Sequence, residues 1–427
     1  MPELQPLRAD HAGPLLTFET DNRTFFARSI PDRRDAYFAN FAANHRDLLA
    51  EQEAGTIRFH VLVGDDGEIL GRFNLFDVDG GTAEVGFRMA EKATRRGVAT
   101  AALRELCDLA KSYGLHGLKA RADIGNIGSR RVLRRNGFIP TNETQTGGTS
   151  TGETTFWRDL DDEFRIGGEL RVRRLGFGAM HLSPTDGDVV RRAVELGVTL
   201  IDTAYLYGWG ANEELLARTL WPYRKEVLVT TKVGVARPGR LDGRPEVLRA
   251  QVHAALTRLR MGRLDLLQLH RIDPEVPLAD QVGALKDLRD QGKIGHIGLS
   301  EVTVDQLAEA RGIVEVASVQ NRYNLLDREH EQVLAACEAA GIAFLPWRPV
   351  LPGVTDSAVG EVATEIGATP AQTSLAWLLA RSPVMLPIPG TAKITHLEEN
   401  IAAGALRLTR AQRDRLGSAA RPGESLR

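Results

Sequence analysis

Four polar side chains in the C-terminal half have the types that carbonyl reduction requires. Asp202 and Tyr207 lie in the segment LIDTAYLYG, Lys232 ends the run VLVTTK, and His270 ends the run LDLLQLH. A carbonyl oxygen that gains charge as hydride arrives needs a proton or a stabilising group, and a tyrosine hydroxyl can supply the proton. A lysine ammonium favours the phenolate, so we expect Lys232 to lower the pKa of Tyr207 and Asp202 to pair with the lysine. The imidazole of His270 is expected to orient the carbonyl group or relay the proton.

Apolar strand candidates alternate with helical segments throughout this half of the chain. The candidates are 175–180, 199–203, 227–233, 264–270, 294–300, 317–321, 343–347 and 384–388. Eight strands that alternate with helices over about 260 residues are typical of a (β/α)8 TIM barrel, an α/β fold whose strands carry functional residues at their C-terminal ends. Asp202, Lys232 and His270 all stand at or near such ends. On the pattern alone, an open doubly wound sheet remains the alternative.

The segments that carry these residues resemble the aldo-keto reductase superfamily, and the likeness extends over most of the C-terminal half. It rests on LGFGAMHL, IDTAYLYG, TTK, LQLHRID, GKIGHIGLS, SVQNRYN and MLPIPGTAKITHLEENI. The resemblance implies NADPH-dependent reduction of an aldehyde or ketone, a small-molecule carbonyl substrate, with Tyr207 as the proton donor. It also implies that Ser300 and Gln320 hold the nicotinamide carboxamide and that Trp347 stacks on the nicotinamide ring.

The segment IPGTAKITHLEEN is implied to bind the adenosine end of the cofactor. The implied contacts are Gly390, Thr391, Lys393, Glu399 and Asn400. The family usually has an arginine for the ribose 2′-phosphate where this chain has His396, and Lys393 offers a point charge in its place. Glu301 also departs from the family, in which an asparagine often follows the serine. NADPH is therefore the predicted cofactor, and NADH stays an open alternative.

Two segments of the N-terminal half have the pattern of a pyrophosphate site. In AEKATRRGVATAALRELCDLAKSYG a strand precedes a glycine turn and a helix, whose free N–H groups and dipole attract phosphate. In DIGNIGSRRVLRRNGFIP, Asn126 and Ser129 stand between a strand end and a helix. Together the segments resemble the cofactor-binding motifs of GNAT acetyltransferases, nearest to those that acetylate protein N-termini or small molecules. The resemblance implies that acetyl-CoA, as co-substrate, contacts Arg96, Gly97, Val98, Ala99, Thr100 and Asn126.

Acetyl transfer needs a base for the acceptor amine and an acid for the departing thiolate. Glu84, on the strand before the glycine turn, is the candidate base. Many members of the family have a tyrosine where this chain has Leu133, so Ser129 becomes the candidate acid. The predicted acceptor is an amine, either a small molecule or a protein N-terminus. An inactive domain that senses acetyl-CoA, or a relic of one, is the alternative.

The length of 427 residues predicts two domains, because single cores rarely exceed about 300 residues. Adjacent strand candidates at 57–63, 69–76 and 83–89, followed by helices, predict an α+β sheet domain of the GNAT type. The polar stretch 141–155 is interpreted as a loop between strands of this domain. The acidic segment DLDDEF marks the boundary, so the predicted domains are 1–161 and 162–427.

Composition excludes several classes of partner. The formal charge is −2, from 54 basic and 56 acidic residues, so we expect neither a nucleic acid nor a membrane surface as partner. The two cysteines, Cys107 and Cys337, stand far apart in apolar helical patterns, and we predict neither a disulfide nor a metal site. No apolar run of 18 residues and no secretory leader pattern occurs, which predicts a cytoplasmic protein.

Overall fold

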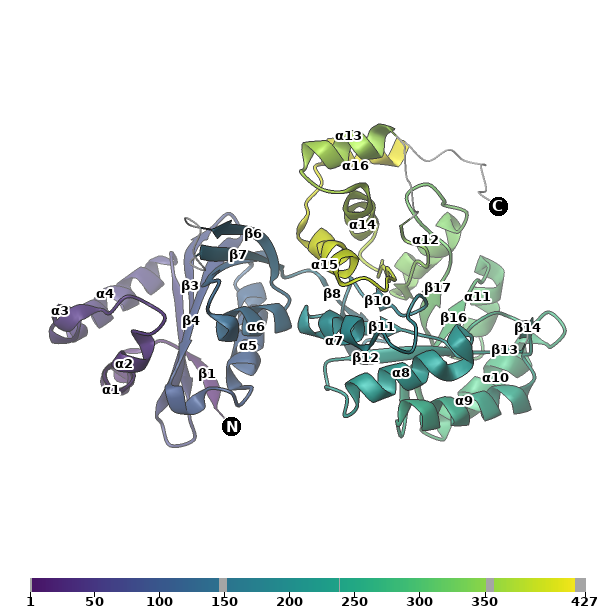
Figure 1. Ribbon diagram of the computed structural model, residues 1–427, viewed down its shortest axis with the longest axis horizontal. Helices are drawn as coiled ribbons and strands as arrows, with labels where there is room; N and C mark the ends of the chain where they lie inside the picture. Colours follow the sequence, from purple (N-terminus) through teal and green to yellow (C-terminus); the bar gives the residue numbers. More distant parts are fainter. Residues whose placement is uncertain (1, 146–151, 238, 351–356, 419–427) are drawn as a thin grey trace. The chain divides into compact units, whose positions relative to one another are not determined.

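The computed structural model describes residues 2–145, 152–237, 239–350 and 357–418. The chain divides into two compact units, Met1–Asp161 and Asp162–Arg427, and each is built around its own sheet (Figure 1). Among the described residues, no helix is both long enough and apolar enough to cross a membrane.

A seven-stranded sheet with the order β1-β2-β3-β4-β5-β7-β6 forms the middle of the first unit. Its strands are β1 (Glu3–Pro6), β2 (Arg58–Val63), β3 (Ile69–Asp79), β4 (Thr82–Met89), β5 (Gly117–Asp123), β6 (Ile139–Gln145) and β7 (Gly152–Asp159). Helices α1 (Ala12–Asp21), α2 (Arg23–Phe26), α3 (Arg34–Ala39) and α4 (Phe41–Ala54) lie on one face, and α5 (Val98–Ser112) and α6 (Ile127–Arg135) lie on the other (Figure 1). Strands β6 and β7 extend into the stretch 141–155, for which the sequence predicts a loop, and residues 146–151 lie outside the described residues.

The sheet splits between β4 and β5, its one parallel pair of neighbours. The two strands pair only from Thr82 and Gly117 to Val85 and Ala120. Beyond that point β4 continues to Met89 and β5 continues to Asp123 without pairing with each other. Because helices α5 and α6 begin shortly after these two strand ends, both helix N-termini come to the split.

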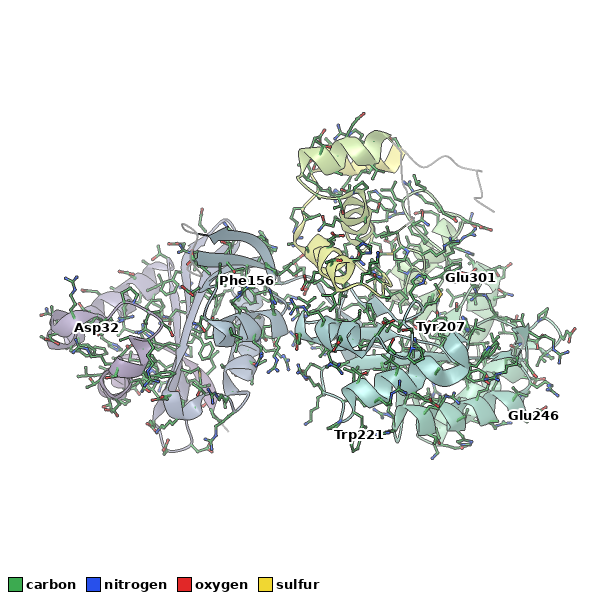
Figure 2. All side chains as sticks on the ribbon, viewed as in Figure 1. Asp32, Phe156, Tyr207, Trp221, Glu246 and Glu301 are labelled. Atoms are coloured by element: carbon green, nitrogen blue, oxygen red, sulfur yellow. The ribbon has the colours of Figure 1, made fainter. Side chains whose placement is uncertain are left out.

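The core of the first unit follows from the spacing of its apolar side chains. Leu103, Leu106, Cys107 and Ala110 recur at helical spacing along α5, and all four are buried. Phe156 is completely buried in β7 and packs within the same core (Figure 2). Burying each large apolar side chain contributes roughly 1.5 to 3 kcal/mol, so this face fixes α5 against the sheet.

A curled parallel sheet with the order β10-β11-β12-β15-β16-β17-β18 forms the second unit. Its strands are β10 (Phe177–Gly178), β11 (Leu200–Asp202), β12 (Leu228–Val233), β15 (Leu264–Leu269), β16 (Ile294–Ser300), β17 (Val316–Gln320) and β18 (Ala343–Phe344). Ten α-helices are described in this unit: α7 (Gly187–Glu195), α8 (Ala211–Leu220), α9 (Pro245–Leu259), α10 (Leu278–Asp290), α11 (Val304–Arg311), α12 (Glu331–Ala340), α13 (Ser357–Glu365), α14 (Pro370–Arg381), α15 (Ile394–Ala402) and α16 (Arg410–Ser418). A short antiparallel pair, β13 (Val235–Ala236) and β14 (Arg240–Leu241), follows β12.

The predicted eighth strand, 384–388, occurs as single bridges and not as a regular strand. Parallel bridges join Phe344 to Met385 and Gly178 to Gly390, so this segment lies between β18 and β10 and the sheet curls back on itself. Prolines in the segment cannot donate to a ladder, which explains the irregular pairing. The carbonyl groups of Pro387 and Pro389 still accept hydrogen bonds from the N–H groups of Gly176 and Gly178 beside them.

A hairpin that the sequence did not reveal plugs one end of the barrel. Strands β8 (Glu163–Ile166) and β9 (Leu170–Arg173) pair antiparallel. Ile166 and Val172 pack with apolar residues from the N-terminal halves of the barrel strands in one buried cluster. In the sequence, the acidic residues at its start indicate only a domain boundary. Because this end is filled, the C-terminal ends of the strands form the mouth.

Candidate functional site

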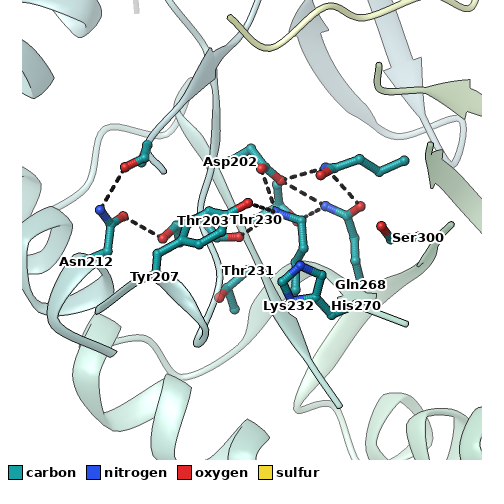
Figure 3. A network of polar contacts seen from close by, with 12 residues as sticks. Asp202, Thr203, Tyr207, Asn212, Thr230, Thr231, Lys232, Gln268, His270 and Ser300 are labelled. Carbon is teal, nitrogen blue, oxygen red and sulfur yellow. Dashed lines mark hydrogen bonds and ion pairs between the residues drawn. The ribbon is translucent and has the colours of Figure 1, made fainter. Parts of the chain in front are cut away.

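The strand ends of the barrel bring a carboxylate, a phenol and an ammonium into direct contact (Figure 3). Asp202 ends β11, Lys232 lies near the end of β12, and Tyr207 begins the short 3-10 helix η3 (Tyr207–Gly210). The Lys232 Nζ donates to Asp202 Oδ2 at 2.6 Å, to the Thr203 carbonyl oxygen at 2.9 Å and to Tyr207 Oη at 3.3 Å. The lysine is completely buried, so these acceptors replace its hydration.

Two glutamines hold the second oxygen of Asp202. Gln268 Nε2 donates to Asp202 Oδ1 at 3.1 Å, and Gln320 Nε2 donates to the same oxygen at 2.9 Å. Gln268 also reaches Thr230 Oγ1 at 3.2 Å. Gln320 is a predicted site residue and Gln268 is not, although a polar residue inside the apolar run LDLLQL was a usable signal.

His270 follows β15 directly, and its ring meets the edge of the Tyr207 ring. The ring centroids lie 6.2 Å apart at an interplanar angle of 88°. Burial, reinforced by the charges of Lys232 and Arg271, lowers the pKa of His270 to about 2. Within the described part of the chain, its buried Nδ1 has no hydrogen-bond partner. The site therefore contains a neutral imidazole with an unused nitrogen.

The electrostatics of Tyr207 differ from the expectation. Burial raises the pKa of Tyr207, and the nearby Lys232 ammonium offsets only part of that effect, so the pKa lies above its ordinary value. The expected lowering of the Tyr207 pKa is wrong, because removing the phenolate from water costs more free energy than its attraction to the ammonium contributes. For Lys232, burial lowers the pKa, but Asp202 and Tyr207 together raise it above its ordinary value. The ammonium is charged and the phenol is protonated at neutral pH.

The residues predicted around the nicotinamide lie at neighbouring strand ends. Ser300 ends β16 and is buried, and its Oγ accepts a hydrogen bond from Arg271 Nη1 at 3.1 Å. Trp347 is half-buried beyond β18, and its Nε1 donates to Glu301 Oε1. Glu301 has a φ of 55°, in the left-handed region that only a few per cent of non-glycine residues adopt. Arg271 was not recognised in the sequence as a site residue.

The residues predicted to bind the cofactor tail occupy one loop and one helix. Gly390 passes so close to the neighbouring strand that an added Cβ would lie 2.8 Å from the Gly178 carbonyl oxygen. Thr391 is buried, and Lys393 is exposed at the N-terminus of α15. Glu399 and Asn400 lie further along that helix. An exposed ammonium at a helix N-terminus suits a phosphate group.

A cavity of about 1150 Å³ opens at the split between β4 and β5 in the first unit. Six predicted residues line it: Gly97, Val98, Ala99, Thr100, Asn126 and Ser129. Gly97 has a φ of 77° and stands at the start of α5, where the conformation favours glycine.

Two predicted acetyltransferase residues are not among those that line this cavity. Arg96 is absent from its lining, although Arg95 and Gly97 on either side of it contribute to the walls. Glu84 pairs with Arg121 at 2.9 Å and lies before the split, so the structure does not bring it to the other candidates. The prediction of Glu84 as base is not supported by this geometry.

Asn126 has a structural role that the sequence did not predict. Its Oδ1 accepts the Ser129 N–H at 3.0 Å and caps helix α6. Leu133, where the family often has a tyrosine, is buried in the wall of the same cavity.

A group of polar residues at this cavity was not predicted from the sequence. Arg72 and Asn74 of β3 line it together with Arg88 of β4, and Glu19 of α1 pairs with both arginines. The signal was present in GRFNLF and GFRM, where polar residues alternate with apolar ones along both strands.

Metal chemistry has no candidate in the described ranges. No group of three or more His, Cys, Asp or Glu side chains is arranged there to hold an ion. Cys107 and Cys337 are both buried.

Comparisons with known proteins identify a family for each unit. The aldo/keto reductase family model matches residues 174–359 and 355–421, and the acetyltransferase (GNAT) domain model matches residues 3–139. An uncharacterized oxidoreductase of Schizosaccharomyces pombe is 42% identical over 260 residues, which is 57% of this chain and 85% of that protein. Pyridoxine 4-dehydrogenase of Escherichia coli is 38% identical over 266 residues, which is 57% of this chain and 93% of that protein. A solved aldo-keto reductase of Klebsiella pneumoniae in complex with NADPH is 26% identical with a TM-score of 0.54, covering 62% of this chain and 96% of the other.

Proposed function

The chain belongs to the aldo-keto reductase family, and we propose that residues 162–427 reduce an aldehyde or ketone with NADPH. We also propose that residues 1–161, which match the GNAT domain model, transfer an acetyl group from acetyl-CoA to an amine. One observation carries the first part: Lys232 Nζ lies within hydrogen-bond distance of both Asp202 Oδ2 and Tyr207 Oη. This contact supports the roles proposed for the three side chains.

Tyr207 is the proposed proton donor. Its raised pKa keeps the phenol protonated at neutral pH, so a proton is available when the carbonyl oxygen gains charge. Bound NADPH supplies the hydride that forms the new C–H bond at the carbonyl carbon. The carbonyl oxygen takes the phenolic proton, and the Lys232 ammonium stabilises the phenolate that is left.

His270 has the complementary role of orienting the substrate. A neutral imidazole does not repel the Lys232 ammonium, and its ring can bind the substrate oxygen or an adjacent group. Asp202 acts through the lysine and is a positioning residue, since both of its oxygens bind protein groups.

The chain offers a consistent set of groups for a nicotinamide dinucleotide. Ser300 and Gln320 present polar atoms at adjacent strand ends, and Glu301 fixes the indole of Trp347. Lys393 and His396, both exposed, favour the 2′-phosphate of NADPH over the free hydroxyl of NADH. The NADPH held by the Klebsiella relative supports the same choice.

Acetyl transfer by the first unit is supported by the cavity at the split in the sheet. The glycine turn and the start of α5 line this cavity, and their N–H groups suit a pyrophosphate. Ser129 is the acid-base candidate that lies at the cavity. A domain that binds acetyl-CoA without transferring the acetyl group is the competing proposal.

Two assays on the full-length chain test these proposals. NADPH and NADH consumption are compared across a panel of aldehydes and ketones, with pyridoxine oxidation included because of the Escherichia coli relative. We expect faster consumption of NADPH, and no turnover with any carbonyl compound would contradict the reductase proposal. CoA release with a panel of amines tests the transferase: binding of acetyl-CoA without release would favour a sensor, and no binding would favour a relic.

A further inference from the structure

The cavity of the first unit has a polar floor made of Arg72, Asn74, Gly86 and Arg88. Arg72 pairs with Arg88 across β3 and β4, and Asn74 pairs with Gly86, so all four residues share one face of the sheet. Diagonal neighbours in such a pair lie about 7 to 8 Å apart, a span that a small ligand with two polar groups can bridge. All four residues line the cavity that also contains the glycine turn of α5.

The polar floor carries an uncompensated positive charge. Glu19 Oε1 accepts from Arg72 Nη1 at 2.8 Å, and Glu19 Oε2 accepts from Arg88 Nη1 at 2.9 Å, so one buried carboxylate serves two guanidinium groups. Burial lowers the pKa of Arg88 to about 10, which leaves it charged at neutral pH. The carboxylates that line the cavity are Asp123, which binds the Gly125 N–H, and Glu153, which lies 3.8 Å from Arg121. A buried net charge is costly, and an anionic group on a ligand offsets that cost.

Asn74 provides the second part of the floor. Its side chain is only 7% exposed, and its buried Oδ1 has no hydrogen-bond partner among the described residues. A buried acceptor without a partner destabilises the empty site, so the site gains when a ligand donates an N–H to it. Gly86 opposite has no side chain, and the Phe76 ring covers it, 2.8 Å from the position of a Cβ.

Aromatic side chains form the walls above the floor. Phe25, Phe26 and Phe76 line the cavity, and the Arg88 guanidinium lies 5.3 Å from the centroid of the Phe26 ring. The site thus combines an apolar wall, a cation with unused N–H groups and an unpartnered acceptor.

We infer that the acetyl acceptor is a small amine with a carboxylate and an apolar body, as in a hydrophobic amino acid. Its carboxylate binds Arg88, its amino N–H donates to Asn74 Oδ1, and its apolar body packs on the phenylalanine rings. The inference rests on the proposed acetyl transfer. The bound ammonium first gives one proton to water, which leaves the neutral, nucleophilic amine. The nitrogen attacks the thioester carbonyl carbon, the N–C bond forms, the C–S bond breaks, and the thiolate leaves with the proton that the amine gives up.

Binding to the full-length chain in the presence of CoA tests the inference without turnover. The probes are L-phenylalanine, L-phenylalaninamide and 2-phenylethylamine, measured by calorimetry. Because one charge-assisted contact changes affinity by about 30-fold, we expect phenylalanine to bind about 30-fold more tightly than the other two probes. Arg88→Gln should remove this preference, so that the three probes bind with similar affinity. Arg8→Gln is the matched control, because Arg8 is exposed, pairs with Asp10 and does not line the cavity.

A second variant and the wild-type protein provide further comparisons. Arg88→Lys retains the charge that pairs with Glu19 and should give an intermediate loss, which covers the case that the glutamine variant unfolds. The wild-type probe series needs no variant at all. Equal binding of the three probes, no binding of phenylalanine, or tighter binding of a peptide with an N-terminal phenylalanine would overturn the inference. Phenylalanine binding without CoA release would refute acetyl transfer but support the proposed binding site. CoA release only with uncharged or cationic amines would support acetyl transfer but refute the proposed binding site.

Discussion

The mouth of the barrel and the cavity of the first unit differ in how fully their buried polar groups are paired. At the barrel mouth, Lys232 has three acceptors, and both oxygens of Asp202 bind protein groups. In the cavity, Glu19 is shared by two arginines, and Asn74 Oδ1 has no partner in the described residues. At the barrel mouth, the Lys232–Asp202 pair is fully hydrogen-bonded before substrate arrives, and the site is organised for charge that develops during a reaction. The cavity site is incomplete and is organised for the groups that a ligand brings.

Removing the Tyr207 hydroxyl should have the largest effect of all the changes on the activity of the barrel site. Tyr207→Phe leaves the Lys232–Asp202 pair in place and removes the proton donor, so we expect kcat for aldehyde reduction to fall about 10³-fold. Steady-state NADPH consumption measures the change. Tyr223→Phe is the matched control, because that hydroxyl donates to the Leu259 carbonyl oxygen, away from the predicted site residues. An unchanged kcat in Tyr207→Phe would remove this tyrosine from the chemistry.

Breaking the buried ion pair should destabilise the barrel. Lys232→Met leaves the Asp202 carboxylate buried without its cation, which should lower the free energy of unfolding by about 3 to 5 kcal/mol. Adding Asp202→Asn to Lys232→Met should restore part of the stability and none of the activity. Calorimetry of the barrel transition measures both, and Lys286→Met, which breaks an exposed pair with Asp290, should cost less than about 0.5 kcal/mol. Equal losses in the two lysine variants would show that burial of the pair is unimportant.

The neutral imidazole makes the barrel sensitive to acid. The pKa of His270 is about 2 in the folded chain and about 6.5 when unfolded, so the unfolded state binds more protons between these values. Stability from this source is complete above about pH 6.5 and is lost as the pH falls, by about 2 kcal/mol at pH 5. His270→Gln cannot titrate and should remove that part of the dependence. Thermal unfolding at pH 7 and pH 5 measures the difference, and parallel curves for both proteins would contradict the assignment.

Two glycine substitutions in the first unit should have the smallest effects, and together they distinguish backbone strain from loss of acetyl-CoA binding. Gly97 and Gly114 have φ values of 77° and 80°, and an added Cβ would meet nothing within 4 Å at either position. Gly97→Ala and Gly114→Ala should each cost about 1 kcal/mol of stability, since alanine is strained in this conformation. Of the two glycines, Gly97 alone lines the cavity, so only its variant should weaken acetyl-CoA binding, by about 5-fold to 10-fold. Equal affinities in calorimetric titrations would remove the glycine turn from the site.

Sequence patterns predicted the barrel site better than the cavity. The barrel residues stand at the ends of alternating strands, and that topology forces strand ends to one mouth. Asp202, Lys232, Tyr207 and His270 could therefore be grouped from their positions along the chain. The net direction of the Tyr207 pKa could not be predicted, because it depends on the depth of burial, which spacing does not reveal.

The cavity depends on features that motifs do not contain. Its floor arises where Arg72 and Arg88 face each other across strands, a register that only the folded sheet fixes. Glu84 looked like a base in the sequence, but its partner Arg121 comes from the next strand of the sheet. The hairpin β8–β9 was missed because its charged strand residues hide the two buried side chains that plug the barrel.

The pH dependence of hydride transfer in single turnover tests the central claim most directly. If Tyr207 donates the proton and His270 stays neutral, the rate should be constant from about pH 6 to pH 9 and fall only above the ordinary tyrosine pKa of about 10. That alkaline fall should be absent in the slow residual reaction of Tyr207→Phe. A rate that instead changes near pH 6.5, and loses this change in His270→Gln, would contradict the account.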